Sequence, residues 1–200
     1  MALFWRLRLL VRTHLYDLFV TLTNKSYLCT KHFVMDQYKD LKEDGIAHGM
    51  CQKMQDEWGE PNLAQLCRMF FRGMDFCIEQ NWPSVEQMKH IATPEEAARY
   101  GVYYEDGVAS GQVNICALGD AVVHVYVPAF GTCDIYARHE SNVYIHLAEH
   151  AFCYVSIYDN ADVSVEEKAH AARINASSFG GTIHNASLFD NIHDKQADKR

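Results

Sequence analysis

The sequence predicts an α+β fold in which an N-terminal helical cap precedes a β-solenoid of ten-residue strand–turn units. Residues 111–165 repeat with a period of ten, and every second position in a unit is small or apolar. This alternation is typical of a strand with one buried face. Residues 35–102 instead show helical spacing of apolar side chains and several helix-start signals. The two patterns therefore place helices before strands.

The inward columns of the repeat are uniform in residue type. One column contains only Gly111, Ala121, Gly131, Ser141, Ala151 and Ala161. The next contains Val113, Val123, Cys133, Val143, Cys153 and Val163, and a third contains Ile115, Val125, Ile135, Ile145, Val155 and Val165. Parallel stacking places like residues on like residues, which favours a solenoid. An antiparallel meander with turns at 119–120, 139–140 and 159–160 is the alternative.

The length of one coil is left open by the period alone. Ten residues would form half or a third of a coil, and a coil of twenty residues would stack Cys133 on Cys153. The solenoid is expected over residues 103–190, with irregular terminal rungs around Ile174 and Ile183, and residues 191–200 are expected to form a frayed polar tail.

The helical cap is expected over residues 35–102. Helices are predicted over 35–44, 46–58, 62–80, 84–91 and 93–100. Gly45 is expected to end the first helix and Gly101 the last. Thr93-Pro94-Glu95-Glu96 is the clearest start signal, with an N-cap, proline at the first helical position and acids in the first turn. The cap should cover the open first rung, because an unpaired sheet edge invites aggregation.

Residues 1–34 form a separate extension. Arg6, Arg8 and Arg12 interrupt its apolar run, so it fits neither a secretory signal nor a membrane span. Two interpretations are open: an amphipathic helix on a membrane surface, or a misassigned start with translation beginning at Met35.

Composition excludes several function classes. The chain has 26 Asp and Glu against 18 Lys and Arg, a formal net charge of -8, so no nucleic-acid partner is expected. An odd number of cysteines without a CxxC motif fits reduced thiols in a cytoplasmic protein. No metal-ligand spacing, nucleotide-binding loop or catalytic signature occurs. We therefore expect no metal, no cofactor and no catalytic residues of a known motif, and a membrane partner is not expected.

The outward positions of the repeat supply the candidate binding residues. The outward columns hold His124, Asp134, Tyr144 and Tyr154, and then Tyr126, Tyr136, His146 and Ser156. The tyrosines Tyr126, Tyr136, Tyr144 and Tyr154 could bind a glycan, a peptide or a protein. The simpler explanation is that tyrosine is a good strand residue that tolerates half-burial.

Polar groups also gather at the predicted corners, at Arg138-His139-Glu140 and Glu149-His150. Such groups could bind a metal or form an acid–base pair. Their spacing follows the repeat, however, so polar corners explain it without a site.

Three segments resemble a family of short uncharacterised proteins from anaerobic gut bacteria and their phages or other mobile elements. These segments are residues 73–84, 100–103 and 135–141, within a resemblance that covers about 35–165. The resemblance implies a helical cap and a β-solenoid with no known activity, and it has no counterpart to residues 1–34. Arg138 and His139 match the family motif, which adds them to the candidate binding residues.

The sequence thus predicts a non-enzymatic binding or assembly protein of a phage or mobile element, acting through the outer face of the solenoid. Its partner would be a protein or a glycan, and the protein would be virion-associated if it is phage-encoded. A homo-oligomer is compatible with this interpretation. The alternative is a carbohydrate-active hydrolase or lyase that uses corner groups such as Arg138, His139, Glu140 and Glu149. A third reading is a membrane-surface protein that uses residues 1–22.

Overall fold

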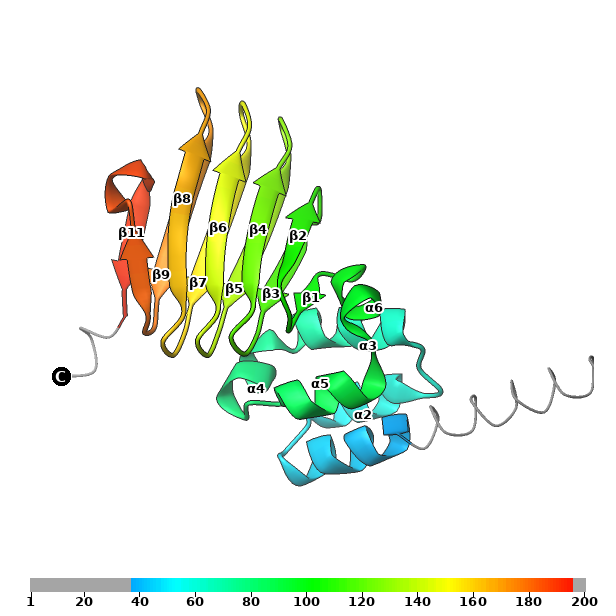
Figure 1. Cartoon of the computed structure of the whole chain (residues 1–200). Coiled ribbons are helices and arrows are strands. Elements are labelled where there is room, and N and C mark those ends of the chain that lie inside the picture. Colours follow the sequence, from blue (N-terminus) through cyan, green and yellow to red (C-terminus); the bar gives the residue numbers. More distant parts are fainter. Residues whose placement is uncertain (1–36, 196–200) are drawn as a thin grey trace, which may run out of the picture.

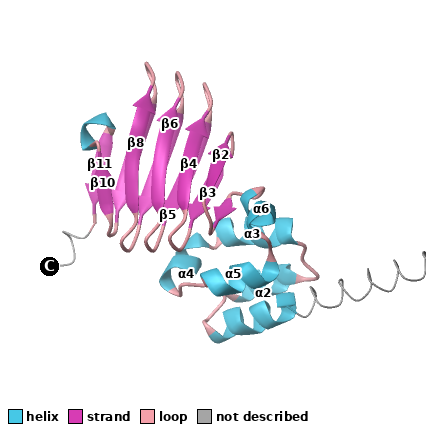
Figure 2. Cartoon of the chain, in the orientation of Figure 1, coloured by secondary structure: helices cyan, strands magenta, loops and turns pink. Residues whose placement is uncertain are grey.

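Parallel strands stacked in two sheets follow a bundle of short helices (Figure 1). The computed structural model describes residues 37–195. Every strand pair in it is parallel, which confirms the α+β fold with a β-solenoid and excludes the antiparallel meander. Figure 2 shows the division between the helical part and the strands.

The described helices begin with one over residues 37–47. The others are α2 (Gln52–Trp58), α3 (Leu63–Arg72), α4 (Met74–Glu79), α5 (Val85–Ile91) and α6 (Pro94–Ala98), with a late 3-10 helix η1 (Ala186–Leu188). Sheet A contains β1 (Val102–Tyr103), β3 (Asn114–Ala117), β5 (Thr132–Ala137), β7 (Phe152–Ile157), β9 (Arg173–Ser178) and β11 (Asn191–Asp194), in that order. Sheet B contains β2 (Gly107–Ser110), β4 (Val122–Val127), β6 (Asn142–Leu147), β8 (Asp162–Lys168) and β10 (Thr182–His184).

One regular coil of the solenoid contains twenty residues and one strand from each sheet. Cys133 pairs with Cys153 and Val123 with Val143, so the stacked partners are twenty positions apart. Consecutive ten-residue units therefore alternate between sheets A and B. Tight turns join them, with positive φ at Gly119, His139 and Asp159 on one side. The same side chain columns consequently point inward in both sheets.

The inward columns form the solenoid core as predicted, except that Gly111 and Val113 are exposed and Gly131 is half-buried. Ile135, Ile145 and Val155 are at most 1% exposed, and Ile174 of β9 is fully buried. Val113 is 58% exposed instead, because residues 111–113 form an irregular connection into β3 rather than a strand. The period fails at the first coil, where the solenoid meets the cap.

The cap confirms the predicted start signals and corrects three boundaries. The second helix, expected over residues 46–58, begins only at Gln52. Thr93 and Ser84 each form a complete capping box, with Glu96 and Gln87. Gly45 does not end the first helix, which runs through residue 47. It is needed there because a side chain would collide with Met50 and Trp82. The expected single helix over residues 62–80 is divided at Gly73 into α3 and α4.

The cap covers more of the solenoid than its first rung. Val102 and Tyr104 around β1 are buried in the core of the cap, and so are the outward-facing Cys116 of β3 and the following Leu118. Phe71 of α3 also contacts Tyr136 of β5, with ring centroids 6.5 Å apart. The cap therefore packs on the outer face of sheet A near β3 and β5, as well as on the β1 end.

Both ends of the solenoid core are closed by the chain itself. At the first coil Tyr103 joins the core and Ala98 of α6 packs against it. At the last coil Phe189 and Leu188, next to η1, cover the core. Residues 191–194, predicted as part of a frayed tail, form β11 and pair with β9. Backbone pairing explains this strand, because all four of its side chains are exposed.

The predictions for residues 1–34 lie outside the described residues. Among the helices of residues 37–195, none has the length and apolar character that a membrane crossing requires.

Candidate functional site

The four predicted tyrosines lie on two different surfaces. Tyr126 of β4 and Tyr144 of β6 are on the outer face of sheet B, whereas Tyr136 of β5 and Tyr154 of β7 are on the outer face of sheet A. The reason is the coil of twenty residues, which sends successive units to opposite sheets. The prediction of one outer face with four tyrosines is therefore corrected to two faces.

Sheet B carries the larger exposed aromatic cluster, which we call the aromatic ladder: His124, Tyr126, Tyr144 and His146. The rings of Tyr126 and His146 stack at 4.4 Å with an interplanar angle of 7°. His124 stacks on Tyr144 at 5.0 Å and 19°. In-register pairing of β4 with β6 produces both stacks. Figure 1 shows no described helix in front of β4, β6 and β8.

Stacking decides which atoms the aromatic ladder presents to solvent. Neighbouring rings cover each other's faces, so the ladder exposes mainly ring edges. The Nε2 atom of His146 is buried and has no hydrogen-bond partner among the described residues. Tyr126 is 44% exposed, and its other in-register neighbour is Ser110 of β2. Because serine is small, one face of the Tyr126 ring is left without a stacking partner from β2.

A groove of about 250 Å³ lies beside this open end of the ladder. Ser110, Tyr126, Pro128, His146 and Glu167 are among its lining residues. It combines an aromatic ring, a hydroxyl group, an imidazole and a carboxylate. These groups can stack on a flat apolar surface and hydrogen-bond to polar substituents around it.

The tyrosines of sheet A are engaged inside the protein. Tyr136 is half-buried beneath α3, where it contacts Phe71, and burial raises the pKa of its phenol. The hydroxyl of Tyr154 lies 2.6 Å from Ser177 Oγ in a hydrogen bond. Sheet A therefore offers less free aromatic surface at these positions than sheet B does.

Arg138 does not belong to an exposed corner, and its prediction as a surface binding residue is corrected. The side chain is 2% exposed and lies under the cap. Its Nη2 donates to Asn81 Oδ1 at 3.3 Å, while Nε and Nη1 have no partner among the described residues. Its positive charge acts to lower the pKa of the buried Cys116 thiol, against the larger effect of burial, which raises that pKa. The cap, whose position the repeat pattern does not show, is the reason for its burial.

His139 is half-buried at the same junction and is held by two hydrogen bonds. Its Nδ1 accepts from the Gly119 amide at 3.0 Å, and its Nε2 lies 2.8 Å from Asn81 Oδ1. An amide donor on Nδ1 requires that nitrogen to be unprotonated, so Nε2–H is the donor to Asn81. Desolvation and the neighbouring Arg138 lower the pKa of His139, while Asp159 opposes them. Nε2 thus joins the solenoid to the cap, whereas Nδ1 joins two neighbouring turns of the solenoid.

The corner carboxylates of the enzymatic alternative are far apart. Glu140 and Glu149 lie in the turns before and after β6, a strand of six residues. Such a strand separates its ends by about 20 Å. Paired carboxylates of glycosidases lie about 5–10 Å apart. Glu140 and Glu149 therefore do not form a paired acid–base site with each other. No three metal-ligating side chains cluster within residues 37–195.

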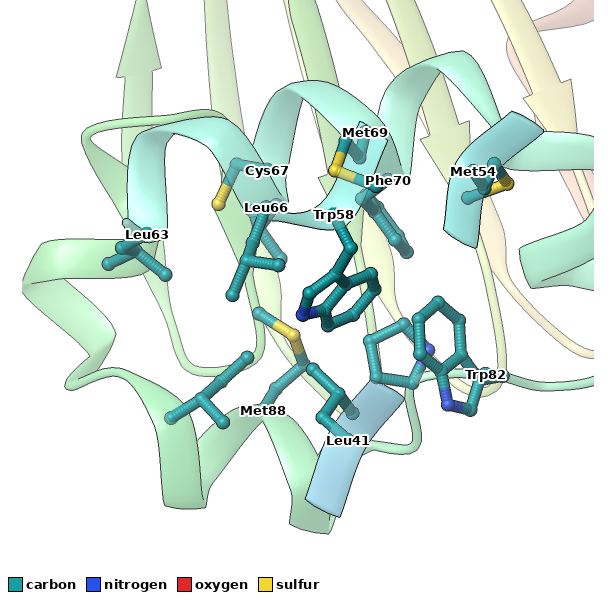
Figure 3. A pocket seen from close by; sticks show the side chains of 13 residues that line it. Leu41, Met54, Trp58, Leu63, Leu66, Cys67, Met69, Phe70, Trp82 and Met88 are labelled. Atoms are coloured by element: carbon teal, nitrogen blue, oxygen red, sulfur yellow. The ribbon is translucent and has the colours of Figure 1, made fainter. Parts of the chain in front are cut away.

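An apolar cavity in the cap is too small for a ligand (Figure 3). It lies among Leu41, Trp58, Leu66, Phe70 and Met88, and its volume is about 20 Å³. This is the space of about one water molecule, and an apolar lining gives water no partners. We interpret the cavity as a packing gap.

Sequence reasoning placed His124 and His146 in outward columns but did not include them among the binding residues. The signal was present, because both share a sheet with Tyr126 and Tyr144 once the coil has twenty residues. In the comparisons with known proteins, no family model, curated protein or solved structure matches this chain. The fold and the ladder thus define the protein as a capped, two-sheet β-solenoid with an exposed aromatic surface on sheet B.

Proposed function

We propose that this protein is a non-enzymatic binding protein that recognises a glycan through the aromatic ladder of sheet B. The observation that carries the proposal is the open face of Tyr126, which borders a groove with polar groups on its other sides. Aromatic rings have a negative face, which attracts the C–H groups of a pyranose. A sugar ring placed over Ser110 would continue the stack formed by Tyr126 and His146.

The polar groups of the groove suit the hydroxyls of such a ring. Ser110 can donate or accept, and Glu167 accepts. A protein partner would also contact the ring edges of the ladder, but it would not need a single open aromatic face. The assignment to a phage or mobile element stays a prediction from the resemblance.

The proposal is tested by screening the full-length protein on an array of immobilised glycans. We expect capture of a defined group of glycans, with affinity reduced about tenfold by Tyr126→Ala, which removes the stacking surface. Ser110→Phe should also abolish capture, because an added ring would fill the place of the sugar while the ladder is kept. Phe152→Ala is the matched control, since Phe152 is 40% exposed on sheet A.

Binding that Tyr126→Ala and Ser110→Phe leave unchanged would disprove a role for this face. Capture of proteins but no glycan, lost in the same two variants, would replace the glycan with a protein partner. Circular dichroism of each variant shows whether the fold is kept.

A further inference from the structure

A second groove, larger than the one beside the ladder, lies between the cap and the first coil. Its volume is about 530 Å³, within the range of small-molecule sites. Three elements form it: α3, the residues after α6, and the connection into β3. Figure 1 shows α3 and α6 beside β1 and β3. The lining residues are Ala64, Cys67, Arg68, Phe71, Arg72, Arg99, Tyr100, Gln112, Val113 and Asn114.

The charge of this groove is opposite to that of the protein. Its lining contains three arginines and no Asp or Glu, whereas the chain has a formal net charge of -8. Arg72 is neutralised by Glu57, with Nη1 2.9 Å from Oε2 and Nη2 3.2 Å from Oε1. Arg68 and Arg99 are exposed and make no ion pair within residues 37–195. Two guanidinium groups are therefore free to bind an anion.

Planar and amide groups accompany the two arginines. Tyr100 is 43% exposed and Phe71 is half-exposed in the same lining. The Gln112 amide is fixed by the Tyr103 hydroxyl at 2.7 Å and the Ala98 carbonyl at 2.6 Å. The side-chain amide of Asn114 has no hydrogen-bond partner in the described part of the chain. It can donate to and accept from a ligand at once.

From this arrangement we propose that the groove binds a small phosphorylated ligand with a planar ring, in chemical terms a nucleoside monophosphate. Arg68 and Arg99 bind the phosphate, because guanidinium matches phosphate oxygens in charge and geometry. Tyr100 stacks on the planar ring, and Asn114 hydrogen-bonds to the ring edge. The volume and the acidic remainder of the protein disfavour a long polyanion, so this site does not conflict with the expected absence of a nucleic-acid partner.

Isothermal titration calorimetry of the full-length protein tests the site with four nucleoside monophosphates, adenosine and inorganic phosphate. At least one monophosphate should bind with a dissociation constant below about 1 mM. Phosphate and adenosine should each bind more weakly, since each supplies only part of the contacts. Arg68→Gln and Arg99→Gln should each weaken monophosphate binding about tenfold.

The Tyr100→Ala variant separates the contribution of the ring contact from that of the phosphate contacts. It should weaken the monophosphate about tenfold and leave inorganic phosphate unchanged. Arg173→Gln is the charge-matched control, because Arg173 lies on β9, outside the groove, and should leave binding intact. Tyr126→Ala should also have no effect, which separates this site from the ladder.

Three results would overturn the proposal: no monophosphate binding up to about 10 mM, undiminished binding by the Arg68→Gln/Arg99→Gln double variant, or equal affinity for adenosine and its monophosphate. Variants with altered circular dichroism are replaced by Arg68→Lys and Arg99→Lys, which keep the charge but lose the bidentate geometry. These should retain part of the affinity.

Discussion

At the scale of single residues, Arg138 is the one charged side chain that is buried among the described residues. It carries a charge, is 2% exposed, and has one neutral hydrogen-bond partner, Asn81. Two of its guanidinium nitrogens lack partners within the described residues. Burying a charge without an acid costs several kcal/mol. The residue therefore fills space at the junction of cap and solenoid at a cost in stability.

Replacing Arg138 with methionine tests this interpretation. Methionine has a similar length and no polar nitrogen, so Arg138→Met should leave the free energy of unfolding unchanged or raise it by about 1 kcal/mol. Arg138→Ala should lower it by about 2 kcal/mol, because a cavity is left. Urea unfolding followed by circular dichroism measures both. Equal losses in the two variants would show that the guanidinium itself is stabilising.

His139 makes the stability of the same junction depend on pH. The neutral ring accepts from the Gly119 amide at Nδ1, and protonation of Nδ1 would remove that bond. Burial and the neighbouring Arg138 hold the pKa of His139 in the folded protein below its ordinary value of 6.5. The unfolded chain binds more protons in the interval between the two values. The contribution of His139 to the stability of the folded protein is complete above pH 6.5 and is lost as the pH falls towards the lowered pKa.

The His139→Gln variant should show this difference directly. Between about pH 8 and about pH 5.5, the wild-type protein should lose more unfolding free energy than the variant. The two proteins differ at this one side chain, so the comparison isolates His139. Parallel pH profiles for the two proteins, each measured by urea unfolding, would contradict the assigned tautomer.

At the scale of the elements, the place of each cysteine in the fold decides whether its thiol is protected from solvent. Cys133 of β5 and Cys153 of β7 point inward and pair in register. Cys116 of β3 points outward but is covered by the cap. Burial raises the pKa of Cys67, Cys77 and Cys116 to about 12. Cys51 precedes α2 and is exposed.

Alkylation of the native protein should follow this order. With iodoacetamide at about pH 8, Cys51 should react first, whereas the five buried cysteines should react only after unfolding, because the thiolate is the nucleophile. Peptide mass spectrometry gives the extent of reaction at each position, and Cys29 lies outside the described residues. Fast native labelling of Cys133 or Cys153 would be incompatible with their place in the core.

At the scale of the whole molecule, the cap and the solenoid have separate apolar cores, but residues of the solenoid chain complete the core of the cap. Val102, Tyr104, Cys116 and Leu118 belong to the chain from β1 onward, yet they are buried among the residues of the cap. Asn81 joins the two parts through Arg138 and His139. The solenoid is therefore not complete without the helices.

Removal of the cap should expose these four side chains. A protein of residues 101–200 should aggregate or melt at least about 10 °C below the full-length chain, since it exposes apolar side chains and the edge of β1. Residues 35–200 should keep the melting temperature of the full chain. Size-exclusion chromatography and thermal circular dichroism compare the three proteins. A monomeric, equally stable solenoid would show that the helices are dispensable.

The repeat made much of this fold predictable. Columns such as Ile135, Ile145 and Val155 identify a parallel solenoid because stacked strands place like positions together. Thr93 and Ser84 mark helix starts through local backbone hydrogen bonds. The candidate site was less predictable. The correct tyrosines could be separated only after the coil length was known, and Tyr136 and Arg138 were covered by helices that the period does not place.

The sequence by itself determined the alternation, the parallel stacking and the capped helices, because these depend on neighbours at short or periodic separations. Only the tertiary structure decided the coil of twenty residues, the burial of Arg138 and the burial of Cys116. It also decided the aromatic ladder on one sheet and the arginine groove between the parts. These features depend on contacts between segments distant in the chain, for which local pattern carries no signal.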